Sequence, residues 1–161
     1  MLRLRALRRE DNPAVSQVIR TVMTEFNCVG EGYSINDPEV DDMFSAYSQA
    51  RAGFFVLNDE EEHIAGVGGY APLAGGDGTT CELRKMYLLP AARGQGAGRR
   101  LLEHCLQAAA ADGYSRMYLE TVAGMTDAAA LYARNGFMTL SAPLGHTGHC
   151  SCDRYMVREL V

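Results

Sequence analysis

The chain has 161 residues, of which 47% are hydrophobic, and its formal net charge at pH 7 is -5. This length suits one well-packed domain and makes a second domain improbable. The acidic sequence pI of about 5.3 argues against nucleic acid as a main partner, and no run of about 18 uncharged apolar residues offers a membrane span.

The N-terminus and the cysteines indicate the compartment. Residues 1–9 are basic but lack the apolar run of a signal peptide. The five cysteines are odd in number and scattered, so reduced thiols are a better interpretation than a disulfide framework. We therefore expect a soluble, cytoplasmic protein with no membrane partner.

The first quarter of the chain predicts a strand and a helix. Leucine or alanine alternates with arginine over residues 2–9, which is typical of a strand with one buried face. Asp11 and Pro13 then suit the cap and first turn of a helix. Apolar residues recur at helical spacing as far as Phe26, which predicts helix one.

Turn residues divide the segment that follows. Residues 27–37 are rich in glycine and asparagine and predict a loop. Apolar residues at helical spacing predict a second helix from Pro38 to about Arg51. Residues 54–57 and 64–70 predict two strands of an antiparallel hairpin.

The second half of the chain predicts strands and helices in turn. A charged central strand covers residues 81–89 and leads through a glycine-rich turn into a helix that ends near Asp112. A strand over 114–122, a helix over 126–135 and two strands near 137–142 and 151–160 complete the order. The whole chain thus predicts about seven strands and about four helices around one mixed, mostly antiparallel sheet.

The glycine-rich turn has the features of a phosphate site. Gly94, Gly96 and Gly98 lie where a helix opens, between Arg93 and Arg99. The first N–H groups of a helix lack partners and carry partial positive charge, and glycine lets a ligand approach them closely. The spacing fits neither a P-loop nor a dinucleotide-binding turn.

Two motifs carry a resemblance to a known superfamily. Arg93, Gly96 and Gly98 match the pattern (R/Q)-x-x-G-x-(G/A), and a later segment contains Tyr132 and ends at Gly136-Phe137. In these motifs and their order the chain resembles the GNAT superfamily of acyl-CoA N-acyltransferases along essentially its whole length. The resemblance implies one α/β domain of the GNAT fold over residues 1–161.

The resemblance also implies a function and its partners. It implies an enzyme, an N-acetyltransferase that moves an acetyl group from acetyl-CoA to a primary amine of a small molecule or peptide. We expect the protein to form a homodimer and to bind no metal. The alternative is a noncatalytic acyl-CoA-binding sensor or structural module.

GNAT folds splay the fourth and fifth strands apart, which leaves backbone groups free to pair with the pantetheine arm of the cofactor. Met125 departs from the family pattern, because many members have an Asn there that contacts the cofactor. The resemblance implies cofactor contacts at Met86, Tyr87, Leu88, Arg93, Gly94, Gln95, Gly96, Ala97, Gly98 and Arg99.

The central strand is unusually charged, since a strand covered on both faces is normally apolar. Alternation predicts that Glu82, Arg84 and Met86 share one face and that Lys85 and Tyr87 share the other. A protonated amine must lose a proton before it attacks a thioester. The resemblance assigns the general-base role to Glu82, and the alternative is a salt bridge from Glu82 to Arg84 or to a helix.

Tyr132 is the second expected catalytic residue. The resemblance assigns it as the acid that protonates the departing CoA thiolate, and the alternative is a buried tyrosine whose hydroxyl caps a neighbouring strand. The thioester carbonyl would be polarised by a backbone N–H near Leu88. Transfer is expected to be direct, in a ternary complex, since no Ser or Cys lies in a nucleophile motif, although Cys81 neighbours Glu82.

Two further clusters have competing interpretations. His146, His149, Cys150 and Cys152 suggest zinc, but their spacing matches no recognised pattern. The preferred interpretation is that Cys150 and Cys152 are small core residues, and the resemblance places the Gly145–His149 turn beside the acceptor pocket. An acidic run could form a rim that favours cationic amines, or it could compensate helix dipoles. This run comprises Glu31, Asp37, Glu39, Asp41 and Asp42.

Overall fold

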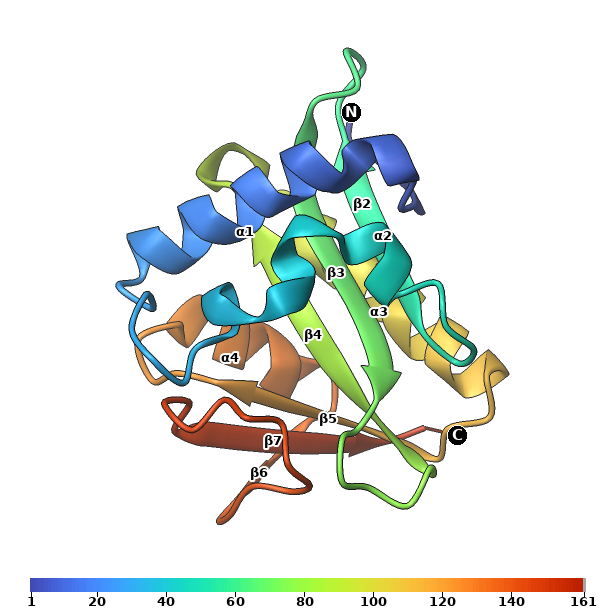
Figure 1. Ribbon diagram of the computed structural model, residues 1–161, viewed down its shortest axis with the longest axis vertical. Helices are drawn as coiled ribbons and strands as arrows, with labels where there is room; N and C mark the ends of the chain where they lie inside the picture. Colours follow the sequence, from blue (N-terminus) through green and yellow to red (C-terminus); the bar gives the residue numbers. More distant parts are fainter. Residues whose placement is uncertain (161) are drawn as a thin grey trace.

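Seven strands and four α-helices form the molecule in the computed structural model, which describes residues 1–160 (Figure 1). The strands are β1 (Arg3–Ala6), β2 (Gly53–Asn58), β3 (Ile64–Pro72), β4 (Thr80–Leu88), β5 (Arg116–Thr121), β6 (Met138–Leu140) and β7 (Arg154–Glu159). They make one sheet in the order β1-β2-β3-β4-β5-β7-β6, in which only β4 and β5 are parallel neighbours. The predicted mixed, mostly antiparallel sheet is confirmed.

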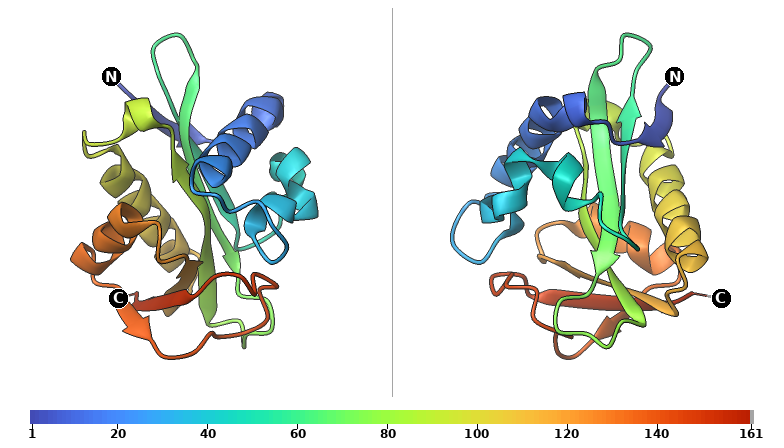
Figure 2. Two further views of the ribbon diagram at one scale, coloured as in Figure 1. Left: turned by 90° about the vertical axis from the view of Figure 1, so that its left-hand side faces the viewer. Right: turned by 45° about the vertical axis from the view of Figure 1, so that its right-hand side comes forward.

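The helices cover both faces of the sheet. They are α1 (Asn12–Glu25), α2 (Met43–Ala46), α3 (Ala97–Ala111) and α4 (Thr126–Arg134). Figure 2 shows α1 and α2 on one face and α3 and α4 on the other. Among residues 1–160, no helix combines the length and apolar character that crossing a membrane requires.

The sheet separates two apolar clusters. Val15, Ile19 and Val22 of α1 are buried against one face, and Leu101 and Cys105 of α3 are buried against the other. Each such side chain contributes roughly 1.5–3 kcal/mol when fully buried. The helical spacing of apolar residues therefore marked the sides of α1 and α3 that meet the sheet.

The predicted continuous helix over residues 38–51 is wrong. The chain forms a 3₁₀ helix over Pro38–Asp41 and then the short α2. At the break, Asp42 has φ -145° and ψ 64°, and its carboxylate accepts hydrogen bonds from Ser45 N at 3.3 Å and Asn12 Nδ2 at 2.9 Å. Aspartate favours such capping over a helix interior, so Asp42 starts a new helix.

A bulge in β4 reverses the direction of its side chains. Lys85 has φ +52°, and the pairing with β3 shifts between Arg84 and Tyr87. As a result Lys85 and Tyr87 lie on the α1 face with Glu82, while Met86 packs in the α3 cluster. The predicted sharing of a face by Glu82 and Met86 is wrong, because the bulge adds a residue to the ladder.

The two central strands separate after a short contact. β4 and β5 pair only from Thr80 to Glu82, opposite Arg116 to Tyr118. Beyond that point they diverge, as Figure 1 shows, while β5 continues beside β7 as far as Thr121. The expected splay is therefore present, and it opens the sheet next to Glu82.

Candidate active site

A cleft of about 820 Å³ lies where β4 and β5 diverge. Of the expected cofactor contacts, Gln95 and Ala97 do not line it. The Gln95 amide donates to Ala91 O at 2.9 Å, and Ala97 is buried in the core. The expected contacts that do line the cleft are Met86, Tyr87, Leu88, Arg93, Gly94, Gly96, Gly98 and Arg99.

The three glycines of the turn serve two purposes. Gly94 and Gly96 have φ of +75° and +77°, and a Cβ on either would meet no heavy atom within 4 Å. The open space beside them belongs to the cleft, which suits a ligand that approaches the backbone closely. Gly98 instead allows close packing, since its Cβ would lie 3.0 Å from Leu88 and 3.3 Å from Leu131.

Arg93 links the glycine-rich turn to β4 and α1 through hydrogen bonds. Its Nε donates to Leu88 O at 3.0 Å, and its two terminal nitrogens each donate to Glu25 at 2.7 Å. Arg93 and Glu25 are each about one-third exposed, so water and salt screen the pair. An anionic ligand at the turn would therefore compete with Glu25 for the Arg93 guanidinium.

A second, smaller cavity of about 60 Å³ continues from the cleft. Charged side chains from three parts of the chain line it: Glu82, Arg84 and Lys85 of β4, Glu120 of β5, and His149 of the loop before β7. The two cavities share Met86, Tyr87, Met125, Ala128 and Tyr132. A ligand in the cleft and a ligand in the small cavity would thus meet beside Tyr132.

Glu82 has one engaged oxygen and one free oxygen. Its side chain is 3% exposed, and Oε1 accepts a hydrogen bond from Arg84 Nε at 2.6 Å, so the salt bridge considered as an alternative is present. Oε2 faces His149. Burial raises the pKa of Glu82, and the charge and hydrogen bond of Arg84 hold part of that rise back. The free oxygen keeps a base role compatible with the ion pair.

Tyr132 lies in α4 at the junction of the two cavities. Its hydroxyl has no hydrogen-bond partner among residues 1–160, so it caps no strand in the described structure. Burial raises the pKa of the phenol above its usual range, which keeps the hydroxyl protonated at neutral pH. A protonated hydroxyl without a partner can act as a donor to a ligand.

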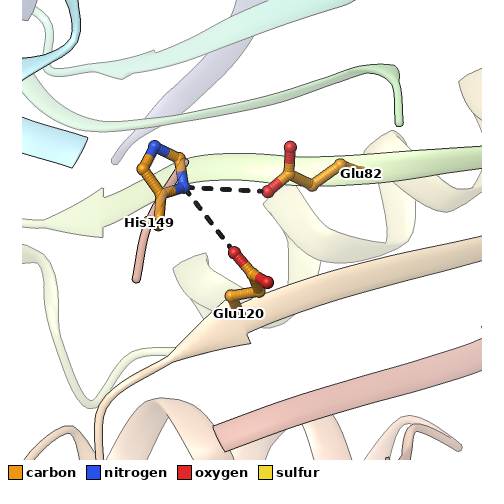
Figure 3. A group of neighbouring side chains, drawn as sticks. All are labelled: Glu82, Glu120 and His149. Carbon is orange, nitrogen blue, oxygen red and sulfur yellow. Dashed lines mark ion pairs between the residues drawn. The ribbon is translucent and has the colours of Figure 1, made fainter. Parts of the chain in front are cut away.

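Sequence reasoning named His149 only within the zinc-like cluster and the turn expected beside the acceptor pocket, whereas the structure places it among three carboxylates. Its Nε2 is 2.9 Å from Asp37 Oδ2, and its Nδ1 is 3.8 Å from Glu120 Oε1 and 4.0 Å from Glu82 Oε2. Figure 3 shows the ring nitrogen pointing toward both glutamates. Asp37 lies 112 positions away from His149 in the chain, so no local pattern could have indicated this contact.

The four tail residues that suggested zinc do not converge. His149 and Cys152 line the small cavity, while His146 packs beside Gly75. The expected core position of Cys150 is wrong, because this residue is exposed. Within residues 1–160, the one group with metal-ligand spacing is Glu82, Glu120 and His149. Of the Gly145–His149 turn, His149 lines the small cavity.

Four of the five side chains of the acidic run have specific partners within the protein. Lys85 is 1% exposed, and its Nζ donates to Asp37 at 2.8 Å and to Glu39 at 2.5 Å. Asp41 pairs with Arg20 at 2.8 Å, and Asp42 caps α2. These four carboxylates thus form specific structural contacts rather than a free acidic rim.

Cys81 is not suited to nucleophilic attack. It is fully buried, and burial raises the pKa of its thiol to about 12. The thiolate is the reactive form of cysteine. The neighbour of Glu82 therefore stays a thiol at neutral pH.

Comparison with known proteins places the chain among acetyltransferases. A family model described as the acetyltransferase (GNAT) family matches residues 17–137. An uncharacterised N-acetyltransferase of Escherichia coli (strain K12), YjgM, is 42% identical over 158 residues, which are 98% of this chain and 94% of that protein. A protein of Azospirillum brasilense named IAA acetyltransferase is 37% identical over 79 residues, 49% of this chain and 51% of that protein.

Solved structures share the fold. A GNAT-family acetyltransferase from Staphylococcus aureus Mu50 superposes with a TM-score of 0.89 at 19% identity and covers all of both chains. The putative acetyltransferase YncA from Salmonella typhimurium, solved with its cofactor acetyl-CoA, has a TM-score of 0.77 at 18% identity and covers 100% of this chain and 95% of its own.

Proposed function

Because this chain belongs to the acetyltransferase (GNAT) family and is an acetyl-CoA-dependent acyltransferase, we propose that it moves an acetyl group directly to a primary amine of a small molecule or peptide. The observation that supports this proposal is that the two cavities join. The larger cavity lies beside the glycine turn, and the smaller contains a buried carboxylate. Tyr132 lines both cavities, so donor and acceptor could react beside it.

The larger cleft suits the CoA part of the donor. Gly94 and Gly96 leave space beside the start of α3, which has no side-chain cap, so its free N–H groups are available to the diphosphate. Met86 and Tyr87 follow the last residue of β4 that pairs with β5. Their backbone is proposed to hydrogen-bond the pantetheine amides.

The two catalytic roles follow from the chemistry of transfer. Most amines are protonated at neutral pH, and Glu82 is proposed to accept a proton from the ammonium, which frees the nitrogen lone pair before the C–N bond forms. Burial makes this carboxylate a stronger base than an exposed glutamate. The C–S bond then breaks, and the Tyr132 hydroxyl is proposed to give its proton to the CoA thiolate.

Glu82→Gln and Tyr132→Phe test these roles. Each substitution keeps the size of the side chain but removes the group that transfers the proton, so we expect kcat to fall by roughly 10²- to 10⁴-fold. The dissociation constant of acetyl-CoA, measured by calorimetry, should stay within about twofold, since neither side chain is expected to hold the CoA moiety. Glu61→Gln, in the exposed turn between β2 and β3, is the matched control.

The possible results separate the hypotheses. Unchanged turnover in both variants would refute the assigned roles. A wild-type protein that binds acetyl-CoA but acetylates no amine in a broad library would support the noncatalytic alternative. Lost acetyl-CoA binding in either variant would show that the side chain supports the cleft instead.

A further inference from the structure

The small cavity presents three hydrogen-bond acceptors around one point. Glu82 Oε2, Glu120 Oε1 and His149 Nδ1 lie within 4.8 Å of one another, and their side chains are only 3%, 5% and 10% exposed. The shorter gaps, 3.8 and 4.0 Å, are too long for direct hydrogen bonds. Such spacing suits a single donor group that lies between the three atoms and bonds to each.

In its neutral form His149 offers Nδ1 as an acceptor. Its Nε2 lies 2.9 Å from Asp37 Oδ2, and a carboxylate can only accept, so Nε2 carries the hydrogen. In neutral imidazole the other nitrogen then has a lone pair. Nδ1 has no hydrogen-bond partner among the described residues, and it points into the gap between the two glutamates (Figure 3).

The spacing of the three acceptors can be compared with that expected for an ammonium and for zinc. Three hydrogen bonds of about 2.8 Å at tetrahedral angles place their acceptors about 4.6 Å apart. Tetrahedral zinc, with ligands at about 2.0–2.1 Å, places them about 3.4 Å apart. The two gaps from His149 Nδ1, 3.8 and 4.0 Å, lie between these values, so the choice of an ammonium rests on the amine chemistry of the proposed function and not on the spacing.

The cations of the cavity already have carboxylate partners. Arg84 donates to Glu82 and to Pro72 O, and Lys85 donates to Asp37 and Glu39. A carboxylate on the acceptor, next to its amine, would therefore enter a region dominated by negative charge. The cavity, at about 60 Å³, also limits the acceptor to a narrow group.

We propose that the acceptor is an unbranched primary amine without an adjacent carboxylate, and that Glu82 Oε2, Glu120 Oε1 and His149 Nδ1 bind the three N–H donors of its ammonium. We call these three atoms the ammonium tripod. This inference rests on the proposed function and narrows its substrate class. In this arrangement Glu120 and His149 bind the amine, and Glu82 both binds the amine and removes its proton.

The tripod depends on pH through His149. Burial disfavours its charged form, but Asp37, with a smaller contribution from Glu82, outweighs this and raises the pKa of His149, while Lys85 opposes the rise. Glu120 also faces the ring at 3.8 Å. Once protonated, Nδ1 donates and can no longer accept from an ammonium. Amine binding should therefore weaken as the pH falls through the pKa of His149.

Calorimetry with unreactive complexes measures the tripod directly. Propylamine is titrated into the protein saturated with CoA, which carries no acetyl group to transfer. Losing one hydrogen bond to a charged group costs about 1.5–3 kcal/mol, so Glu120→Gln and His149→Phe should each weaken propylamine binding by about 10- to 100-fold. Glu61→Gln should bind like the wild type.

Analogues test the three donors and the missing carboxylate. The wild type should bind propylamine at least about tenfold more tightly than N-methylpropylamine, which has one N–H fewer, and glycinamide at least about tenfold more tightly than glycine. His149→Phe should also remove the part of the pH dependence that follows the titration of His149, while the part that follows Glu82 stays. Equal binding of either pair, or unchanged affinity in Glu120→Gln, would overturn the tripod.

The tripod and the proposed function can fail separately. If amines bind as predicted but receive no acetyl group from acetyl-CoA, the proposed function fails and the tripod stands. If the protein acetylates amines while the affinity of Glu120→Gln and His149→Phe for them matches that of the wild type, the tripod fails and the proposed function stands.

Discussion

Glu82 combines a structural contact with a free reactive atom. Oε1 is held at 2.6 Å by Arg84 Nε, while Oε2 faces the small cavity. Removing a partner from a buried ion pair is costly, because the remaining charge loses its compensation. The ion pair therefore fixes the orientation of the carboxylate, and the outcome of the Glu82→Gln test should be read together with a stability measurement.

The rate of acetyl transfer should depend on the ionisation of Glu82. Burial raises the pKa of Glu82 above its ordinary value, with Arg84 opposing, and only the ionised form can accept a proton. We expect kcat at saturating substrates to fall as the pH drops through that raised pKa. Rapid-mixing measurement of kcat against pH checks this, with Glu82→Gln lacking the same limb. An identical limb in the variant would assign the titration to another group.

The cysteines should differ sharply in reactivity. Cys150 is exposed, whereas Cys81 is fully buried with its pKa raised to about 12. At pH 7 the Cys81 thiol therefore stays protonated. Iodoacetamide followed by mass spectrometry should label Cys150 first and leave acetyl transfer intact. Labelling of Cys81 in the folded protein, with lost turnover, would contradict direct transfer.

At the scale of elements, the bulge in β4 decides which side chains face the acceptor cavity. Lys85 adopts φ +52°, a left-handed conformation that costs a non-glycine residue about 1–2 kcal/mol. Its buried contacts with Asp37 and Glu39 hold it there. The bulge places Tyr87 on the face of Glu82, so β4 lines both cavities.

Two glycines at the start of α3 should respond differently to alanine. Gly96→Ala forces a left-handed alanine, at about 1–2 kcal/mol, and adds a methyl group beside the cleft, so acetyl-CoA affinity should fall about tenfold or more. Gly98→Ala adds a Cβ 3.0 Å from Leu88, so stability should fall by about 1–3 kcal/mol. Calorimetry and urea denaturation measure both effects. Greater loss of affinity in Gly98→Ala than in Gly96→Ala would contradict this division.

At the scale of the whole molecule, the sheet has two parts that pair over a short stretch. β4 and β5 are joined only between Thr80–Glu82 and Arg116–Tyr118, and the cleft lies beyond. A ligand in the cleft would contact β4 and α3 on one side and α4 on the other. Acetyl-CoA should therefore stabilise the fold as a whole.

Thermal unfolding checks this bridging. A ligand at 100 times its dissociation constant stabilises the native state by about 2.7 kcal/mol, which raises Tm by roughly 5–10 °C in a domain of this size. Scanning calorimetry with and without acetyl-CoA should show that shift, and Gly96→Ala should show less at the same concentration. An unchanged Tm would argue against the cleft as the CoA site. A cytoplasmic location and a homodimer stay predictions.

The sequence by itself determined the order of elements and the side on which each long helix packs. Helical spacing in α1 and α3 and the glycine-rich turn are local features, set by backbone geometry and by burial of apolar side chains. The family resemblance carried by local motifs pointed to Glu82, to Tyr132 and to ten cofactor contacts, eight of which line the cleft.

Only the tertiary structure decided which distant groups meet. The break at Asp42 depends on its bond to Asn12, the bulge is held by contacts of Lys85 with Asp37 and Glu39, and His149 is oriented by Asp37. These contacts join residues 30 to 112 positions apart, so their energies arise only once the sheet and helices have packed. The spacing of apolar residues indicates which side of a helix or strand is buried, but it does not indicate which charged residue of another element will lie against that side.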